Sequence, residues 1–141
     1  MPRPAGPVWE PLSEEVRRTL DLLLPRDTPA HRAYRAQLPH TEMAEGCTCP
    51  CGSLHLRVDR TAVPPAPPRG DSPVVAAGSV ATASGKVLGE ALVFDWTDGY
   101  LDELEFALWE ADAVPRPLWE WVRPYGHAAA QDPPRAAPAR G

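Results

Sequence analysis

The sequence has no isoleucine and no asparagine, and Lys86 is its only lysine. Arginine therefore carries nearly all of the positive charge, and we interpret this bias as the mark of a genome rich in G and C. No apolar run approaches the ~20 residues that a helix needs to cross a bilayer, and no basic segment followed by an apolar one opens the chain. We therefore expect a cytoplasmic protein that does not enter a membrane.

An excess of positive charge is also missing. The formal net charge is −5 and the sequence pI is about 5.3. Proteins that bind nucleic acid or anionic membrane surfaces usually carry a strong basic surface, because the phosphate groups must be neutralised. The composition therefore disfavours both kinds of partner.

The 141 residues include 19 prolines, which suit one domain made of short elements. Proline, alanine, arginine and glycine dominate both ends of the chain, and such segments bury too little apolar surface to offset their ordering entropy. We expect a single domain over residues 9–125, with disordered tails at 1–8 and 126–141.

Two helices are predicted near the N-terminus. Ser13 is a good N-cap before two glutamates, and leucines follow at helical spacing until Pro25. Thr28 and Pro29 form a second start signal, since proline is favoured at the first helical position. The second helix should end before Pro39.

A period of two in the apolar residues predicts strands after the helices. The four predicted strands are residues 54–58, 74–82, 86–96 and 100–109, and the proline-rich segment 61–73 is expected to be an exposed connection. The predicted fold class is α+β, with two N-terminal helices packed on a four-stranded, mostly antiparallel meander sheet.

The hairpin around Asp98-Gly99 allows two registers. A two-residue turn would place Leu92 opposite Glu105 and so set apolar groups against carboxylates. A three-residue loop would pair Leu92 with Leu104 and Trp96 with Tyr100. We expect the second register, with Leu88, Leu92, Phe94 and Trp96 facing the helices and Ala91, Val93, Glu103, Glu105 and Trp109 facing outward.

All three cysteines lie within five residues, at Cys47, Cys49 and Cys51. Structural zinc takes four tetrahedral thiolate or imidazole ligands, and His55 is the nearest imidazole that could complete the set, with His40 as an alternative. A zinc site at Cys47, Cys49, Cys51 and His55 is therefore one interpretation of this segment and the alternative to a protein without a cofactor. No other cofactor is expected.

Two further interpretations of the cysteine segment stay open. A disulfide between Cys47 and Cys51 would leave Cys49 free and give a thiol redox function. The segment could also be a structural turn in which small thiols are partly buried.

Carboxylates accumulate in the second half of the chain. Eight of them and no Lys or Arg lie between Val87 and Pro115. Glu103 and Glu105 beside Trp109 would suit a basic protein partner, because acidic groups steer it and an aromatic ring anchors it. A solvated acidic face that only keeps the protein soluble is the alternative. No nucleophile or phosphate-binding motif is present, so we expect a non-enzymatic binding protein.

Four segments carry a resemblance to a known family: Trp9–Ser13, Ala36–Leu38, Gly52–Leu56 and Gly99–Glu105. In their order along the chain, they resemble a family of small uncharacterised bacterial proteins, some of which are associated with toxin immunity. Beside the acidic strands, the resemblance implies an immunity type of protein binding. It supplies no catalytic residue.

Overall fold

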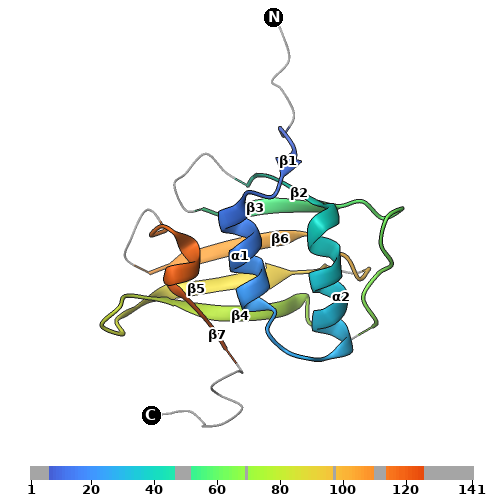
Figure 1. Cartoon of the computed structure of the whole chain (residues 1–141). Helices are drawn as coiled ribbons and strands as arrows, with labels where there is room; N and C mark the ends of the chain where they lie inside the picture. Colours follow the sequence, from blue (N-terminus) through green and yellow to red (C-terminus); the bar gives the residue numbers. More distant parts are fainter. Residues whose placement is uncertain (1–6, 47–51, 69, 97, 110–113, 126–141) are drawn as a thin grey trace, which may run out of the picture.

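The computed structural model describes residues 7–46, 52–68, 70–96, 98–109 and 114–125. Two α-helices, two short 3-10 helices and seven strands make up this part of the chain (Figure 1). The helical elements are α1 (Glu14–Leu23), α2 (Pro29–Gln37), η1 (Leu38–His40) and η2 (Leu118–Glu120). The strands are β1 (Glu10–Pro11), β2 (Thr41–Glu45), β3 (Leu54–Val58), β4 (Val74–Ala81), β5 (Val87–Phe94), β6 (Glu103–Leu108) and β7 (Val122–Pro124).

The prediction of a four-stranded sheet is wrong. The strands form one seven-stranded sheet in the order β1-β2-β3-β6-β5-β4-β7, with antiparallel neighbours throughout. β4, β5 and β6 form the expected meander, but β3 pairs with β6 rather than with β4. Three strands outside the four predicted ones, β1, β2 and β7, extend both sides of the sheet, and β1 and β7 are its short edges.

Both helices begin at the predicted caps. The Ser13 side chain accepts a hydrogen bond from the Val16 amide, and the Thr28 side chain accepts one from the His31 amide. Val16, Leu20 and Leu23 form the buried stripe of α1. Figure 1 shows α1 and α2 side by side across one face of the sheet, here called the inner face. The opposite face is called the outer face.

The register of β5 and β6 differs from the expected one. Leu92 lies opposite Glu105 and Phe94 opposite Glu103, the pairing that the predicted register avoided. The helix side of β5 is identified by Gly78 of β4, where an added Cβ would lie 2.9 Å from the Leu23 Cδ2 atom of α1. Gly78 pairs with Ala91, so Ala91 faces the helices and Leu92 faces outward.

The helices thus pack on the small residues of β5. Ala91 and Val93 are completely buried, whereas the larger Leu92 is only partly buried. Leucines from α1 and the large residues Leu104 and Phe106 of β6 fill the core volume instead. The assumption that the largest apolar side chains of β5 must face the helices is therefore wrong.

The connection between β5 and β6 is held from the helix side, which explains this register. Gln37 at the end of α2 is fully buried, and its side chain donates to the Gly99 carbonyl at 2.7 Å and accepts from the Leu101 amide at 3.0 Å. Ladder pairing stops at Phe94 and Glu103, so the connection is longer than either predicted turn. Its shape depends on contacts with α2, not only on the local Asp98-Gly99 turn.

The described residues of the proline-rich segment 61–73 form no strand, as predicted, but they are not all exposed. Val63 and Ala66 are buried, and the Tyr100 hydroxyl donates to the Val63 carbonyl at 3.0 Å. Within the described ranges, no helix is both long and apolar enough to span a membrane. Most of the predicted tails, at residues 1–6 and 126–141, lie outside the described residues.

Candidate partner-binding face

The outer face of the sheet carries two of the residues predicted to bind a partner. Glu103 and Glu105 alternate along β6 and therefore point to the same side, and both are partly exposed. Glu103 lies opposite Phe94 on β5 and opposite His55 on β3. Glu90 lies opposite Ala107, so its carboxylate joins the same face.

Aromatic rings accompany these carboxylates. Trp96 stacks on Phe94 with ring centroids 5.1 Å apart and an angle of 3° between the planes. Its indole N–H donates to the Glu103 carboxylate at 3.3 Å. Trp96 is 53% exposed, so the prediction that it faces the helices is wrong, and the ring lies beside an acidic group at the surface.

Trp109, the third predicted binding residue, follows the last residue of β6. Its amide donates to the Leu88 carbonyl at 2.9 Å, and its side chain is 64% exposed. Exposed aromatic rings of this size are typical anchors in protein interfaces. The alternation of β6 places Trp109 on the side of Glu103 and Glu105, as predicted from the sequence.

A second tryptophan bounds a shallow groove next to Trp96. Trp9, His55, Trp96, Asp102 and Glu103 are among the residues that line this groove. The Arg57 guanidinium lies 4.3 Å from the centre of the Trp9 ring and also pairs with Glu42 at 2.7 Å. Neither Trp9 nor Asp102 was among the predicted binding residues, because their positions beside Trp96 depend on strand pairing between distant segments.

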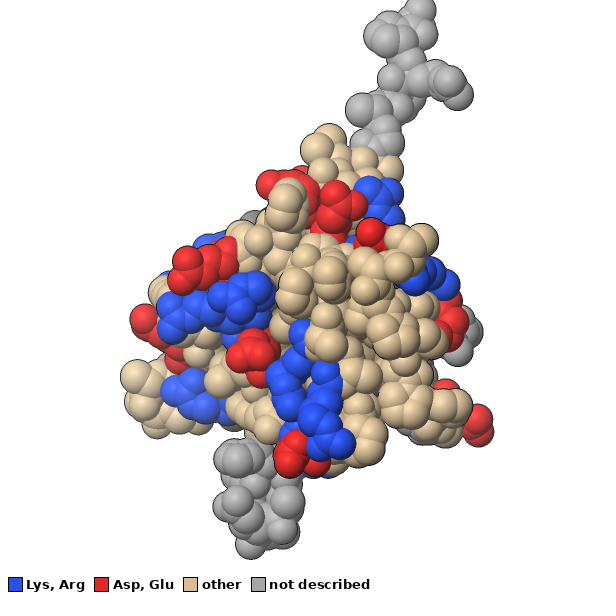
Figure 2. Space-filling model, turned by 45° about the vertical axis from the view of Figure 1, so that its right-hand side comes forward, with Lys and Arg blue, Asp and Glu red and all other residues tan. Residues whose placement is uncertain are grey.

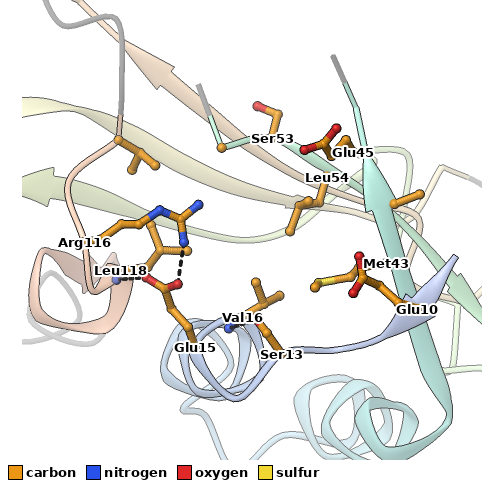
Figure 3. A pocket seen from close by; sticks show the side chains of 13 residues that line it. Glu10, Ser13, Glu15, Val16, Met43, Glu45, Ser53, Leu54, Arg116 and Leu118 are labelled. Atoms are coloured by element: carbon orange, nitrogen blue, oxygen red, sulfur yellow. Dashed lines mark hydrogen bonds and ion pairs between the residues drawn. The ribbon is translucent and has the colours of Figure 1, made fainter. Parts of the chain in front are cut away.

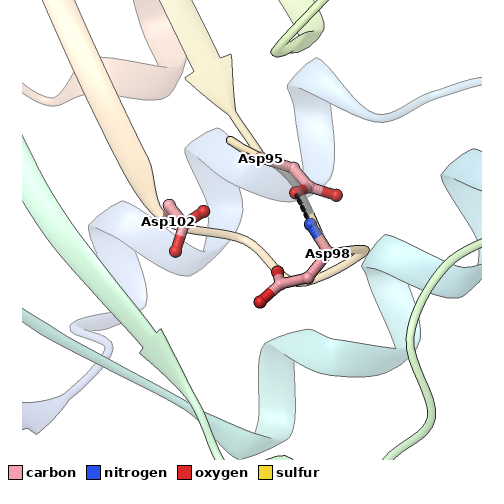
Figure 4. Close-up of side chains that lie close together, drawn as sticks. All are labelled: Asp95, Asp98 and Asp102. Atoms are coloured by element: carbon pink, nitrogen blue, oxygen red, sulfur yellow. Dashed lines mark hydrogen bonds between the residues drawn. The ribbon is translucent and has the colours of Figure 1, made fainter. Parts of the chain in front are cut away.

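Three aspartates converge in the β5–β6 connection, as Figure 4 shows. Carboxylate oxygens of Asp95, Asp98 and Asp102 lie within 4.8 Å of one another. The pKa of Asp102 is raised, chiefly by burial, and the like charges of Asp98 and Asp95 add to the effect. The Trp96 amide and Arg60 oppose the shift.

Protein donors already engage each of these carboxylates. Asp95 accepts from the Tyr34 hydroxyl at 2.5 Å and Asp98 pairs with Arg60 at 2.5 Å. Asp102 accepts from the Trp96 amide at 2.9 Å. Oxygen clusters of this kind suit hard cations such as Ca²⁺, but the bonds described here fasten the connection to α2 and to Trp96. We therefore assign the cluster a structural role.

The predicted zinc ligands are only partly described. Cys47, Cys49 and Cys51 lie outside the described residues, so the zinc site and the thiol alternatives stay predictions. His55 is exposed on β3, and its pairing with Glu103 places it on the outer face. Gly52 has a φ of +84°, and an added Cβ would lie 2.5 Å from the Val114 side chain, so this glycine is explained by turn geometry and close packing.

Comparison with known proteins gives no relative from which a function could be transferred. No family model matches the sequence, and neither a curated protein nor a solved structure matches it. A function must therefore be argued from the surface and cavities of this chain.

Proposed function

We propose that this protein binds a basic protein partner through the outer face of its sheet, without catalysing a reaction. The observation that carries the proposal is the combination of Glu103 and Glu105 with the exposed rings of Trp96 and Trp109. Interfaces are enriched in tryptophan at their centres, and acidic groups around such an anchor select a basic partner.

The charges of the two sides of the molecule support this choice. On the outer face, Glu42 and Arg57 neutralise each other, and Arg123 of β7 lies opposite Ser79, on the side of Glu90. Glu90, Glu103 and Glu105 form no ion pair among the described residues, so carboxylates outnumber cations on this face. The helix side is electrically mixed. Figure 2 shows arginine and acidic side chains interleaved on a face that includes this side. A basic partner is therefore attracted to the sheet rather than to the helices.

An immunity-type role is one form of this function. An immunity protein neutralises a toxin by covering a functional surface, and a toxin that acts on nucleic acid presents a basic surface for its substrate. The acidic and aromatic outer face suits such a target.

Charge reversal tests the proposal. Glu103→Lys with Glu105→Lys replaces two carboxylates by two ammonium groups on the outer face, and we expect binding to a partner captured by the unaltered protein to weaken at least about tenfold. The free energy of unfolding should change by no more than about 1 kcal/mol, because both side chains are partly solvated. Binding is measured by isothermal titration calorimetry and stability by urea unfolding.

A matched control keeps the total charge change the same. Glu14→Lys with Asp21→Lys makes the same reversal on exposed positions of α1, and binding should stay within about twofold of the original. Equal loss of binding in both double variants, or no loss in either, would contradict the assignment of the outer face. Failure of the unaltered protein to capture any basic protein would contradict the function itself.

A further inference from the structure

A cavity of about 480 Å³ opens on the opposite side of the sheet from the proposed binding face. It lies between the start of α1, the strands β1 and β2, and the segment that leads into η2 (Figure 3). Cavities that hold small molecules commonly measure about 300 to 1,000 Å³. This cavity is therefore large enough for a small ligand.

The wall of the cavity is mixed, with the hydroxyls of Ser13 and Ser53 beside a group of apolar side chains. Val16 of α1, Met43 of β2, Leu54 of β3 and Leu118 of η2 contribute to its lining, and Val114 closes another side. Val16, Val114 and Leu118 are almost completely buried and form a firm floor. Met43 and Leu54 are only partly buried, so an apolar ligand body would replace water against these two side chains, which favours binding.

Charged groups line the rim, and two of them form an ion pair with each other. Glu15 forms an ion pair with Arg116, drawn as a dashed line in Figure 3, and also accepts from the Leu118 amide at 2.8 Å. This carboxylate therefore holds η2 against α1. Its charge is balanced by the guanidinium of Arg116.

Two other carboxylates at the rim lack an ion pair with any described arginine or lysine. Glu10 lies opposite Met43 in the β1–β2 pair, and Glu45 follows two residues after Met43 on the same side of β2. Figure 3 shows both carboxylates on the same side of the cavity as Met43. Among the described residues, neither Glu10 nor Glu45 forms an ion pair.

The spacing of these groups favours an organic cation over a metal ion. In the described part of the chain, Glu10, Glu15 and Glu45 do not form a cluster with ligand atoms within 4.8 Å of one another. We propose that the cavity binds a primary alkylammonium ion, with its ammonium group at Glu10 and Glu45 and its alkyl chain against Met43 and Leu54. The apolar side chains select the chain, and the two unpaired carboxylates select the charge.

The test compares three ligands of one chain length on the full-length protein. n-Pentylammonium, pentan-1-ol and pentanoate are titrated separately, and binding is followed by the NMR signals of Val16, Leu54 and Leu118. We expect saturable shifts with pentylammonium, at least about tenfold weaker binding of pentanol, and no saturable shift with pentanoate. Equal binding of pentanol would overturn the role of the carboxylates, and absence of saturation with pentylammonium would overturn the site.

Single charge removals identify the groups that hold the ammonium. Glu10→Gln and Glu45→Gln should each weaken pentylammonium binding about threefold or more, because each removes one partly solvated attraction. Glu42→Gln is the matched control, since Glu42 lies on the same strand but faces outward toward Arg57. A loss in Glu42→Gln as large as in Glu45→Gln would contradict the proposed site, and well-dispersed NMR spectra of all three variants exclude misfolding as the cause.

Discussion

At the residue scale, His31 joins three segments of the protein. Its Nδ1 atom accepts from the Arg26 amide at 3.2 Å, and its Nε2 atom lies 3.2 Å from the Val75 carbonyl of β4, to which it can donate. A neutral imidazole satisfies both contacts, whereas protonation of Nδ1 would break the first. The pKa of His31 is lowered, mainly by burial, with further contributions from the charges of Arg26 and Arg35, although the bond to Val75 opposes the shift.

This lowered pKa predicts a loss of stability in mild acid. Between the folded pKa and the ordinary value of 6.5, the unfolded chain binds more protons at His31 than the folded chain does. The contribution of His31 is therefore present above pH 6.5 and is lost as the pH falls. Urea unfolding should show that the free energy of unfolding drops less from about pH 7.5 to about pH 5 in His31→Gln than in the original protein.

An exposed histidine supplies the control for this measurement. His55 lies on β3 with its side chain in solvent, so His55→Gln should keep the full drop in stability. An identical drop in all three proteins would show that His31 does not contribute to the pH dependence.

At the scale of elements, the sequence predicts best what depends on neighbouring residues. The caps at Ser13 and Thr28 are local hydrogen bonds, and both helices begin where these residues predict. β3 to β6 follow from apolar alternation. β1 and β7 have two and three residues, too few to show a period, and β2 is rich in polar residues. β1 and β7 exist because they pair with strands distant in sequence, and β2 exists because it pairs with the following strand, β3.

The outer face shows the same difference between features that depend on neighbouring residues and features that depend on long-range contacts. Glu103 and Glu105 share a face because side chains alternate along any strand, so their grouping was predictable. The outward direction of Leu92 and Trp96 was not, because it depends on the contacts of Gln37 with the β5–β6 connection. The contact of the Trp96 ring with Glu103 could therefore not be predicted without this register.

The close contact of β5 with β6 also gives a prediction at this scale. An added Cβ at Gly89 would lie 2.1 Å from the Ala107 carbonyl oxygen, so Gly89→Ala must force the strands apart. We expect a loss of about 1 to 3 kcal/mol in the free energy of unfolding, measured with urea. A glycine with free space around it would instead gain about 0.4 to 1 kcal/mol on replacement by alanine, so a neutral or stabilised variant would contradict the close contact.

At the scale of the whole molecule, the sheet separates two different sides. The inner side is covered by α1, α2 and η2 and contains the cavity at its edge, with the carboxylates of Glu10 and Glu45 at the rim. The outer side presents carboxylates beside exposed tryptophans and has no described helix over it. We therefore propose that one side recognises a protein and that the other binds a small cationic ligand.

The tryptophans report on both sides in one experiment. Trp96 and Trp109 are exposed at the outer face, whereas Trp119 lies under Arg18 of α1, with the guanidinium 4.2 Å from the ring centre. Each indole N–H gives its own signal in a nitrogen–proton NMR spectrum. A basic ligand that binds the sheet should therefore shift one group of signals and leave the other in place.

A titration of the protein with a hexa-arginine peptide, followed at these indole signals, tests directly whether the outer face binds a basic partner. We predict that the Trp96 and Trp109 signals shift together and saturate, that the Trp119 signal stays in place, and that Glu103→Lys with Glu105→Lys removes the shifts. Shifts at Trp119 without shifts at Trp96 and Trp109, or no saturable shift at any tryptophan, would contradict the claim that the outer face binds a basic partner.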